Sequence, residues 1–203
     1  MFNSRISAHV SLISIIAIAA CSKSEKPAAD SAASAATTPA PDTAKPAAAA
    51  APAINDAQIA HIAVTANAID STAGALAKKK ASAKAVKDFA QTMVSDHAGV
   101  NKQAVALATK LNVTPEDNDV SKSLKSGADA NMAHLNGLSG AAFDSAYISH
   151  EVDYHQAVLD ALDKTLIPNA QNAELKALLV KVRPAFVAHL DRAKSVQSGL
   201  GKK

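Results

Sequence analysis

The sequence predicts an all-α domain over residues 54–203. Apolar residues recur at spacings of three and four in five successive segments, which is the period of one helix face. No segment shows the strict apolar–polar alternation of a half-buried strand. Short breaks at residues 80–81, 113–115, 139–140 and 167–170 separate the five segments.

The first two helices are predicted at residues 55–79 and 82–112. The short turn between them makes them antiparallel neighbours. Their apolar stripes are Ile59, Ile62, Ala66, Ile69, Ala73 and Leu76 in the first, and Val86, Ala90, Met93, His97, Val100, Ala104, Leu107 and Leu111 in the second.

A third, less periodic helix is predicted at residues 116–138. Pro115 suits its first turn, where a missing N–H costs least. Ser139 and Gly140 end this helix, which lies between two helix pairs and carries the chain across.

The last two helices are predicted at residues 141–166 and 171–198, as a second antiparallel pair. Pro168 is expected to stop the first of them, and Pro184 to kink the second. Their stripes are Ile148, Val152, His155, Leu159, Leu162 and Leu166, then Leu175, Leu179, Val182, Phe186, His189, Ala193 and Val196.

Two hairpins joined by a long crossover make the ferritin-like arrangement. The seams average 3.5 residues, a spacing that suits packing at about 20°. The predicted fold is therefore a ferritin-like four-helix bundle with a shorter crossover helix.

The beginning of the chain predicts a secreted, lipid-anchored protein. Arg5 precedes an apolar run at residues 10–20, which is too short to span a bilayer and ends in small residues. The sequence Ile18-Ala19-Ala20-Cys21 resembles the lipobox of bacterial lipoproteins, in which Cys21 would be diacylated on sulfur, residues 1–20 removed, and the new amine usually acylated. Ser22 stands where an Asp often retains such proteins in the inner membrane, so we expect an outer-membrane lipoprotein facing the periplasm.

Residues 21–53 are predicted to be a flexible tether. They are mostly Ala, Ser, Thr, Pro, Lys and Asp, and five prolines prevent a continuous helix. The predicted organisation is thus a signal peptide at 1–20, a lipidated tether at 21–53 and a helical domain at 54–203.

The charge pattern limits the partners. The formal net charge is +3, and no basic stripe with interleaved aromatic residues is present, which argues against nucleic acid. The densest basic run, residues 78–80, is predicted to be a solvated helix end, with a patch for anionic lipid as the alternative. The expected partners are the membrane, through acyl chains on Cys21, and an envelope protein.

Several segments resemble a bacterial family built on a domain of unknown function. The segments are VKDFA at 86–90, MVSDH at 93–97, FDSAY at 143–147, His155, and His189-Leu190, in order over about residues 57–196. Members of that family are described as outer-membrane or ferritin-like periplasmic proteins. The resemblance implies a ferritin-like bundle and no established activity. Where Asp70 aligns, the family usually has a Glu, so any carboxylate ligand there has a shorter reach.

Three of the seven histidines, His97, His155 and His189, lie on apolar seams of three different helices. Carboxylates lie beside these seams, and imidazole with carboxylate suits iron, zinc, manganese or copper. The candidate metal ligands are Asp70, Asp96, His97, Glu151, His155 and His189.

The ligand pattern differs from that of di-metal carboxylate bundles, because the chain has no Glu-x-x-His motif. Pairing the last two helices about residue 169 also offsets His155 from His189 by about six residues, or roughly 9 Å. The alternative is a buried polar layer, in which histidines and carboxylates hydrogen-bond and fix the helix register.

Two main functions therefore follow from the sequence, and a partner-binding adaptor that uses the exposed helix at residues 116–138 is a third possibility. The first is a non-enzymatic, lipid-anchored envelope protein, and the second is a ferritin-like metal-binding protein that sequesters or oxidises metal. A transition metal is a candidate cofactor that the sequence does not require. No nucleophile elbow, phosphate loop or HExxH helix is present, so catalysis has little support.

Overall fold

The computed structural model describes residues 54–201, and all regular structure in that range is helical, as predicted. No helix in this range is long and apolar enough to cross a bilayer. The predicted signal peptide, Cys21 and the tether lie outside the described residues. The elements are α1 (Asp56–Lys80), α2 (Lys84–Lys110), α3 (Asp119–Asn136), α4 (Gly140–Ala161), the π-helical turn η1 (Leu162–Leu166), α5 (Ile167–Asn169) and α6 (Ala173–Leu200).

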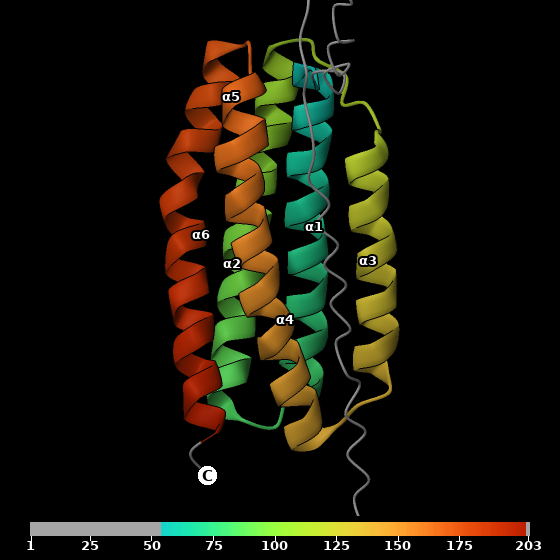
Figure 1. The fold of residues 1–203 in the computed structure, drawn as a ribbon, viewed down its shortest axis with the longest axis vertical. Helices are drawn as coiled ribbons and strands as arrows, with labels where there is room; N and C mark the ends of the chain where they lie inside the picture. Colours follow the sequence, from blue (N-terminus) through green and yellow to red (C-terminus); the bar gives the residue numbers. More distant parts are fainter. Residues whose placement is uncertain (1–53, 202–203) are drawn as a thin grey trace, which may run out of the picture. The chain divides into compact units, whose positions relative to one another are not determined.

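Four long helices, α1, α2, α4 and α6, run lengthwise beside one another, and α3 lies against the outer side of α1 (Figure 1). The most extensive contacts are within the sequential pairs α1–α2 and α4–α6, which the short connections predict. The two pairs meet where α2 packs on α6 and α1 packs on α4. Residues on all four long helices can therefore face a common interior.

Asparagine side chains begin three of the helices. Asn55 accepts a hydrogen bond from the backbone N–H of Gln58, and the Gln58 side chain accepts one from Asn55 in return. Asn118 forms the same reciprocal arrangement at the start of α3, and the Asn172 side chain accepts from two backbone N–H groups of α6. Each cap satisfies N–H groups that the first turn of a helix leaves without a partner.

Two proline predictions are wrong. Pro115 lies in the connection before α3, because the stronger cap at Asn118 sets the start of that helix. Pro168 does not stop the helix before it: the chain passes through the η1 π-turn and Pro168 occupies the first turn of α5, where its missing N–H is tolerated. The turn into α6 therefore lies between Asn169 and Ala173, later than the prediction placed it.

The FDSAY segment has a structural role at the start of α2. Asp144 is 2 % exposed and accepts hydrogen bonds from the backbone N–H groups of Ser82 and Ala83 at 2.9 and 2.8 Å, and from the Ser82 hydroxyl. Ala83, the N-cap residue of α2, has no side-chain oxygen to form a cap. Asp144 on α4 thus caps α2 across the helix packing.

We expect Asp144→Ala to lower the free energy of unfolding by about 1–3 kcal/mol, because buried N–H groups at the start of α2 lose their acceptor. Urea unfolding followed by circular dichroism measures the change. The control is Asp88→Ala on the exposed face of α2, whose carboxylate pairs with Lys84, with an expected loss within about 0.5 kcal/mol. Equal losses in the two variants would contradict the capping role.

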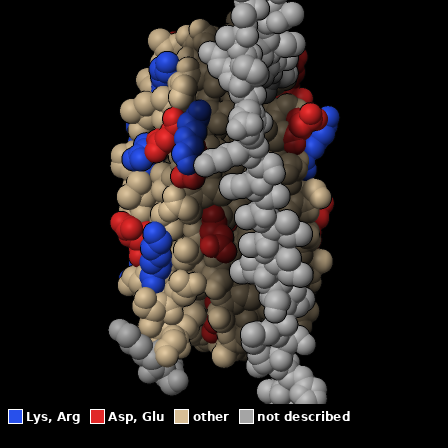
Figure 2. Space-filling view, viewed as in Figure 1, with Lys and Arg blue, Asp and Glu red and all other residues tan. Residues whose placement is uncertain are grey.

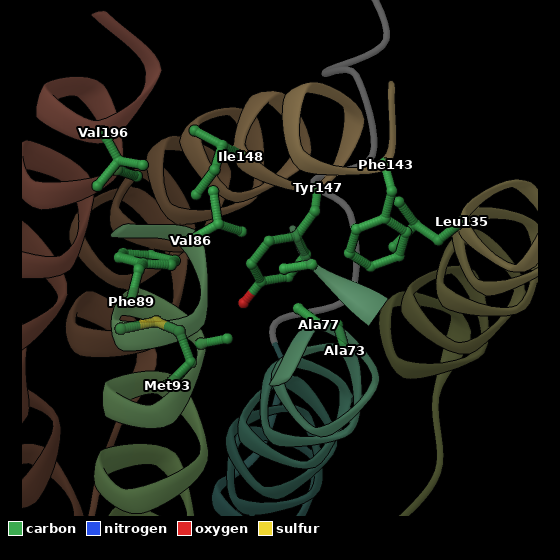
Figure 3. Close-up of a cluster of buried hydrophobic side chains, with 13 residues drawn as sticks. Ala73, Ala77, Val86, Phe89, Met93, Leu135, Phe143, Tyr147, Ile148 and Val196 are labelled. Carbon is green, nitrogen blue, oxygen red and sulfur yellow. The ribbon is translucent and has the colours of Figure 1, made fainter. Parts of the chain in front are cut away.

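Two apolar clusters fill the interior. One surrounds Tyr147, whose ring lies between those of Phe89 and Phe143, and receives residues from α1, α2, α3, α4 and α6 (Figure 3). The other occupies the end of the domain near α5 and includes Ile59, Leu162 and Leu179. On α1 and α2 the buried polar residues fall between the positions that belong to these two clusters, as Glu151 and His155 do on α4, and His189 lies at the edge of the second cluster on α6.

The basic run at residues 78–80 divides into two parts. Lys78 and Lys79 are exposed, as a solvated helix end requires. Lys80 instead donates hydrogen bonds to the backbone carbonyls of Leu135 and Asn136 at 3.0 and 2.7 Å, which ties the end of α3 to α1. On the face seen in Figure 2, lysines and arginines lie beside acidic residues and form no continuous basic patch.

Candidate metal centre

A layer of buried polar side chains separates the two apolar clusters. Asn67 and Asp70 come from α1, His97 from α2, and His189 from α6. Glu151 and His155 come from successive turns of α4 and share one face of that helix. All six residues are at most 7 % exposed, and Asp70, His97, Glu151 and His155 at most 1 %.

The three histidine rings form a nearly equilateral triangle. Their centroids are 5.6 Å apart for His97 and His155, 5.1 Å for His97 and His189, and 5.4 Å for His155 and His189. One ring nitrogen of each lies within 4.8 Å of the others, and a second such group joins Asp70, Glu151 and His155. The two groups share His155, so the five side chains surround one region.

Asn67 fixes the tautomer of His97. The Asn67 amide nitrogen donates to the carbonyl of Ala63 at 2.8 Å, which leaves its oxygen facing His97 Nδ1 at 2.8 Å. An oxygen cannot donate, so Nδ1 carries the proton of the neutral ring and Nε2 carries a lone pair. That lone pair points toward Asp70.

The same logic orients the other two rings. His155 Nδ1 donates to the backbone carbonyl of Glu151 at 2.9 Å, which leaves a lone pair on Nε2. His189 Nε2 donates to Asp96 Oδ2 at 3.0 Å, which leaves a lone pair on Nδ1. Each histidine thus donates outward to an oxygen and turns its other nitrogen inward.

The inward-facing atoms of the three histidines and Asp70 are all acceptors, and the Tyr147 hydroxyl lies beside Glu151 as a donor. Asp70 Oδ2 lies 3.2 Å from His97 Nε2 and 3.4 Å from His155 Nε2. Within residues 54–201, these three atoms, Asp70 Oδ1, Glu151 Oε2 and His189 Nδ1 have no hydrogen-bond partner. Buried acceptors without donors are costly, so a proton or a cation is needed at the centre of the layer.

Burial shifts the pKa values of the carboxyl and imidazole groups in this layer. Burial raises the pKa of Asp70 to about 7, and burial together with the nearby Asp70 raises the pKa of Glu151 well above its usual range. Burial lowers the pKa of His97 to about 3 and that of His155 to about 4, so both rings are neutral at pH 7. Among the described residues, no lysine or arginine pairs with either carboxylate.

Aromatic side chains close the layer against water. Phe186 lies 5.2 Å from the His97 ring and 6.2 Å from the His155 ring, centroid to centroid. Phe89, from the cluster around Tyr147, lies 6.5 Å from the His155 ring, centroid to centroid, and Tyr154 lies 6.2 Å from it. The Tyr154 hydroxyl donates to the carbonyl of Ala66 at 3.0 Å and so is not free to bind a ligand.

Residues 41–196 match the family described as a domain of unknown function, DUF4142. The chain belongs to the DUF4142 family. The match includes every residue of the polar layer. No curated protein and no solved structure matches the chain.

In this DUF4142 protein, five of the six predicted ligands meet in the layer. Asp96, the sixth, faces outward, and its side chain is 46 % exposed. It contacts His189 from the side away from the centre. Asn67 was not named, although it precedes Asp70 by one helical turn and therefore shares its face.

The predicted offset of about 9 Å between His155 and His189 is wrong, because their ring centroids are 5.4 Å apart. The prediction placed the turn between the helices at residue 169. The observed turn between Asn169 and Ala173 is centred about two residues later, which brings the two histidines to within roughly two residues of the same level, or about 3 Å.

The donor set suits a first-row transition metal. Ligand atoms bound tetrahedrally at about 2.1 Å lie about 3.4 Å apart. The separations of Asp70 Oδ2 from the two histidine nitrogens are 3.2 and 3.4 Å. The outward hydrogen bonds to Asn67, the Glu151 carbonyl and Asp96 match the partners that metal-binding histidines usually have.

Proposed function

We propose that this protein is a lipid-anchored protein of the bacterial envelope whose helical domain binds one divalent transition-metal ion. The ligands are His97 Nε2, His155 Nε2, His189 Nδ1 and Asp70 Oδ2, with Glu151 next to Asp70. Of the two main functions that the sequence allows, the geometry favours metal binding.

The observation that supports this proposal best is the convergence of lone pairs. In a purely structural polar layer, each buried acceptor has a donor. Here the three imidazoles donate their N–H groups to oxygens away from the centre of the layer, and the bare Nε2 atoms of His97 and His155 face the Asp70 carboxylate. A divalent ion satisfies all of these atoms at once.

Charge supports the same assignment. When both carboxylates are ionised, they and the three neutral imidazoles carry a charge of about −2, which a divalent cation neutralises inside an apolar interior; without a cation, burial raises the pKa of both carboxyls. Four protein ligands also fill a tetrahedral shell, whereas catalytic zinc sites keep one position open. The site therefore suits retention of a metal ion rather than turnover.

The fold and the anchor complete the proposal. We assign the four long helices to a ferritin-like arrangement, with α3 as the crossover. Cys21 carries the acyl chains, and the domain faces the periplasm on the tether of residues 21–53. Attachment through two or more acyl chains holds a protein stably at a membrane.

Elemental analysis tests metal binding. The protein is purified without an affinity tag from its natural compartment and analysed for iron, zinc, copper and manganese. We expect about one metal ion per chain. No bound metal, even after incubation with each of the four ions, would leave the layer as a structural feature and overturn the proposal.

The hydrogen bond from His189 to Asp96 predicts a partial loss of metal affinity when Asp96 is changed. Asp96→Asn is expected to weaken zinc affinity by about 10–100-fold, because Asp96 orients the ring and raises its basicity without touching the metal. Competition with a chromophoric chelator measures the affinity. The control is Asp88→Asn on the same helix, which should bind zinc like the wild type; an unchanged affinity in Asp96→Asn would contradict the positioning role.

The anchor is tested separately. We expect the mature protein to partition into the detergent phase of Triton X-114 and the Cys21→Ser variant to remain uncleaved and lack the acyl mass. Phase separation followed by immunoblotting measures the partitioning, and mass spectrometry of the N-terminal peptide measures the cleavage and the acyl mass. An unmodified Cys21 in the exported wild-type protein would contradict lipid anchoring while leaving the metal site untouched.

A further inference from the structure

An apolar cavity of about 140 Å³ lies between α1, α2, α4 and α6, in the half of the domain that carries α5. Its lining on α1 extends from Asp56 to Asn67, and its lining on α6 from Leu175 to Phe186. Eleven residues of helix span about 16 Å, so the cavity is long and narrow. Its inner end is formed by Asn67, Tyr154 and Phe186, next to the histidine layer.

Alanine positions create this space. Protein interiors are normally packed without voids larger than a water molecule. Here alanines from three helices face the cavity, and no larger side chain fills the gap. The π-turn η1 contributes Leu162 and Leu166 to the wall, and such turns occur frequently at functional sites. The lining alanines are Ala60, Ala63, Ala66, Ala104, Ala108, Ala157 and Ala161.

The lining offers little to a polar ligand. Asp56 accepts hydrogen bonds from the backbone N–H groups of Gln171 and Asn172, and the Asn172 side-chain oxygen caps α6. Asn67 and Tyr154 are likewise engaged within the protein. The remaining wall is aliphatic or aromatic, and an apolar cavity of about 150 Å³ is known to stay dry and bind benzene.

The cavity reaches the surface near the segment that joins α2 to α3. Val113 in that segment and Val120 in the first turn of α3 belong to its lining, and Val120 is 44 % exposed; Ala157 on α4, which also lines the cavity, is exposed as well. A slender molecule can therefore enter lengthwise, with its far end in solvent.

We propose that this cavity binds a single unbranched hydrocarbon chain, with the polar end of the molecule at the Val120 rim. The length and narrow shape of the cavity favour an alkyl chain over a compact ring system. The same chemistry belongs to a free fatty acid and to the acyl chain of a lipid. This inference is independent of the metal site, since it uses no metal ligand.

The test is isothermal titration of the purified protein with decan-1-ol and with decanoate, and then with a decanoyl lysophospholipid. We expect saturable binding with about one chain per protein. Binding of the free alcohol and acid alone would assign a free fatty acid or alcohol, and binding of the lysophospholipid as well would assign a lipid chain. No binding of any of the three would overturn the proposal.

A variant that fills the cavity is compared with a variant that adds the same side chain elsewhere on the same helix. Ala104→Leu places a larger side chain in the lining of α2 and is expected to weaken decan-1-ol binding by about tenfold or more. Ala98→Leu, at an exposed position of the same helix that does not line the cavity, should bind like the wild type. Equal binding in both variants would contradict the location. If Ala104→Leu does not unfold cooperatively, Ala108→Val serves in its place and is judged by the same comparison.

Discussion

Replacing His155 by alanine is expected to weaken zinc binding by about 100- to 1,000-fold. Zinc-finger peptides gain about 10–16 kcal/mol from four ligands, so each ligand carries roughly a quarter of that energy. His155 belongs to both groups of converging side chains, and its Nε2 lies 3.4 Å from Asp70 Oδ2. Loss of the His155 side chain therefore removes the ligand that the two groups have in common.

The measurement is a zinc titration against a chromophoric chelator, with circular dichroism and thermal melting to verify folding. His134→Ala is the matched control, because His134 is exposed on α3 and distant in sequence from every ligand. Should His155→Ala remain folded and bind zinc as tightly as His134→Ala, the four-ligand site would be refuted. His97→Ala provides a second variant in case the first fails to fold.

Asp70→Asn is expected to abolish tight metal binding and yet stabilise the metal-free protein at pH 8 by about 1–3 kcal/mol. The raised pKa of Asp70, about 7, means that the folded protein binds this proton more tightly than the unfolded chain does. Stability from that proton is therefore present at low pH and is lost as the pH rises from about 4 to about 7. At pH 8 the metal-free protein holds a buried, uncompensated carboxylate.

The substitution removes that charge and places an amide that can donate to a bare histidine nitrogen. Urea unfolding at pH 6 and pH 8, with chelator present, measures the effect, and the gain should be larger at pH 8. Asp88→Asn, an exposed acid, should show no such gain. If Asp70→Asn destabilises the metal-free protein at pH 8, the carboxylate is satisfied by the protein itself and the layer does not need a cation.

The sequence predicted the helices well because their seams are regular. The stripe from Ile59 to Leu76 and the one from Val86 to Leu111 each give one helix whose ends are within two residues of the prediction. The start of α3 was missed because the Asn118 cap outweighs the preference of Pro115 for a first turn. Pro168 misled the placement of the last turn, because a π-turn before it lets the chain remain helical.

The candidate ligands were predictable in part. His97, His155 and His189 stand out because each is polar on an apolar seam. The roles of Asn67 and Asp96 depend on side-chain direction across helices, which seam spacing does not give. Asp96 precedes His97 by one residue, so its side chain is rotated about 100° around the axis of α2 and meets α6 rather than the centre. Its contact with His189 appears only when α2 and α6 are packed.

The most direct test of the central claim is a crystal structure of the protein grown with zinc, with an anomalous difference map at the zinc edge. We expect one strong peak about 2.0–2.2 Å from His97 Nε2, His155 Nε2, His189 Nδ1 and Asp70 Oδ2. A map with no peak in the buried layer, or with zinc held only by exposed side chains, would contradict that claim.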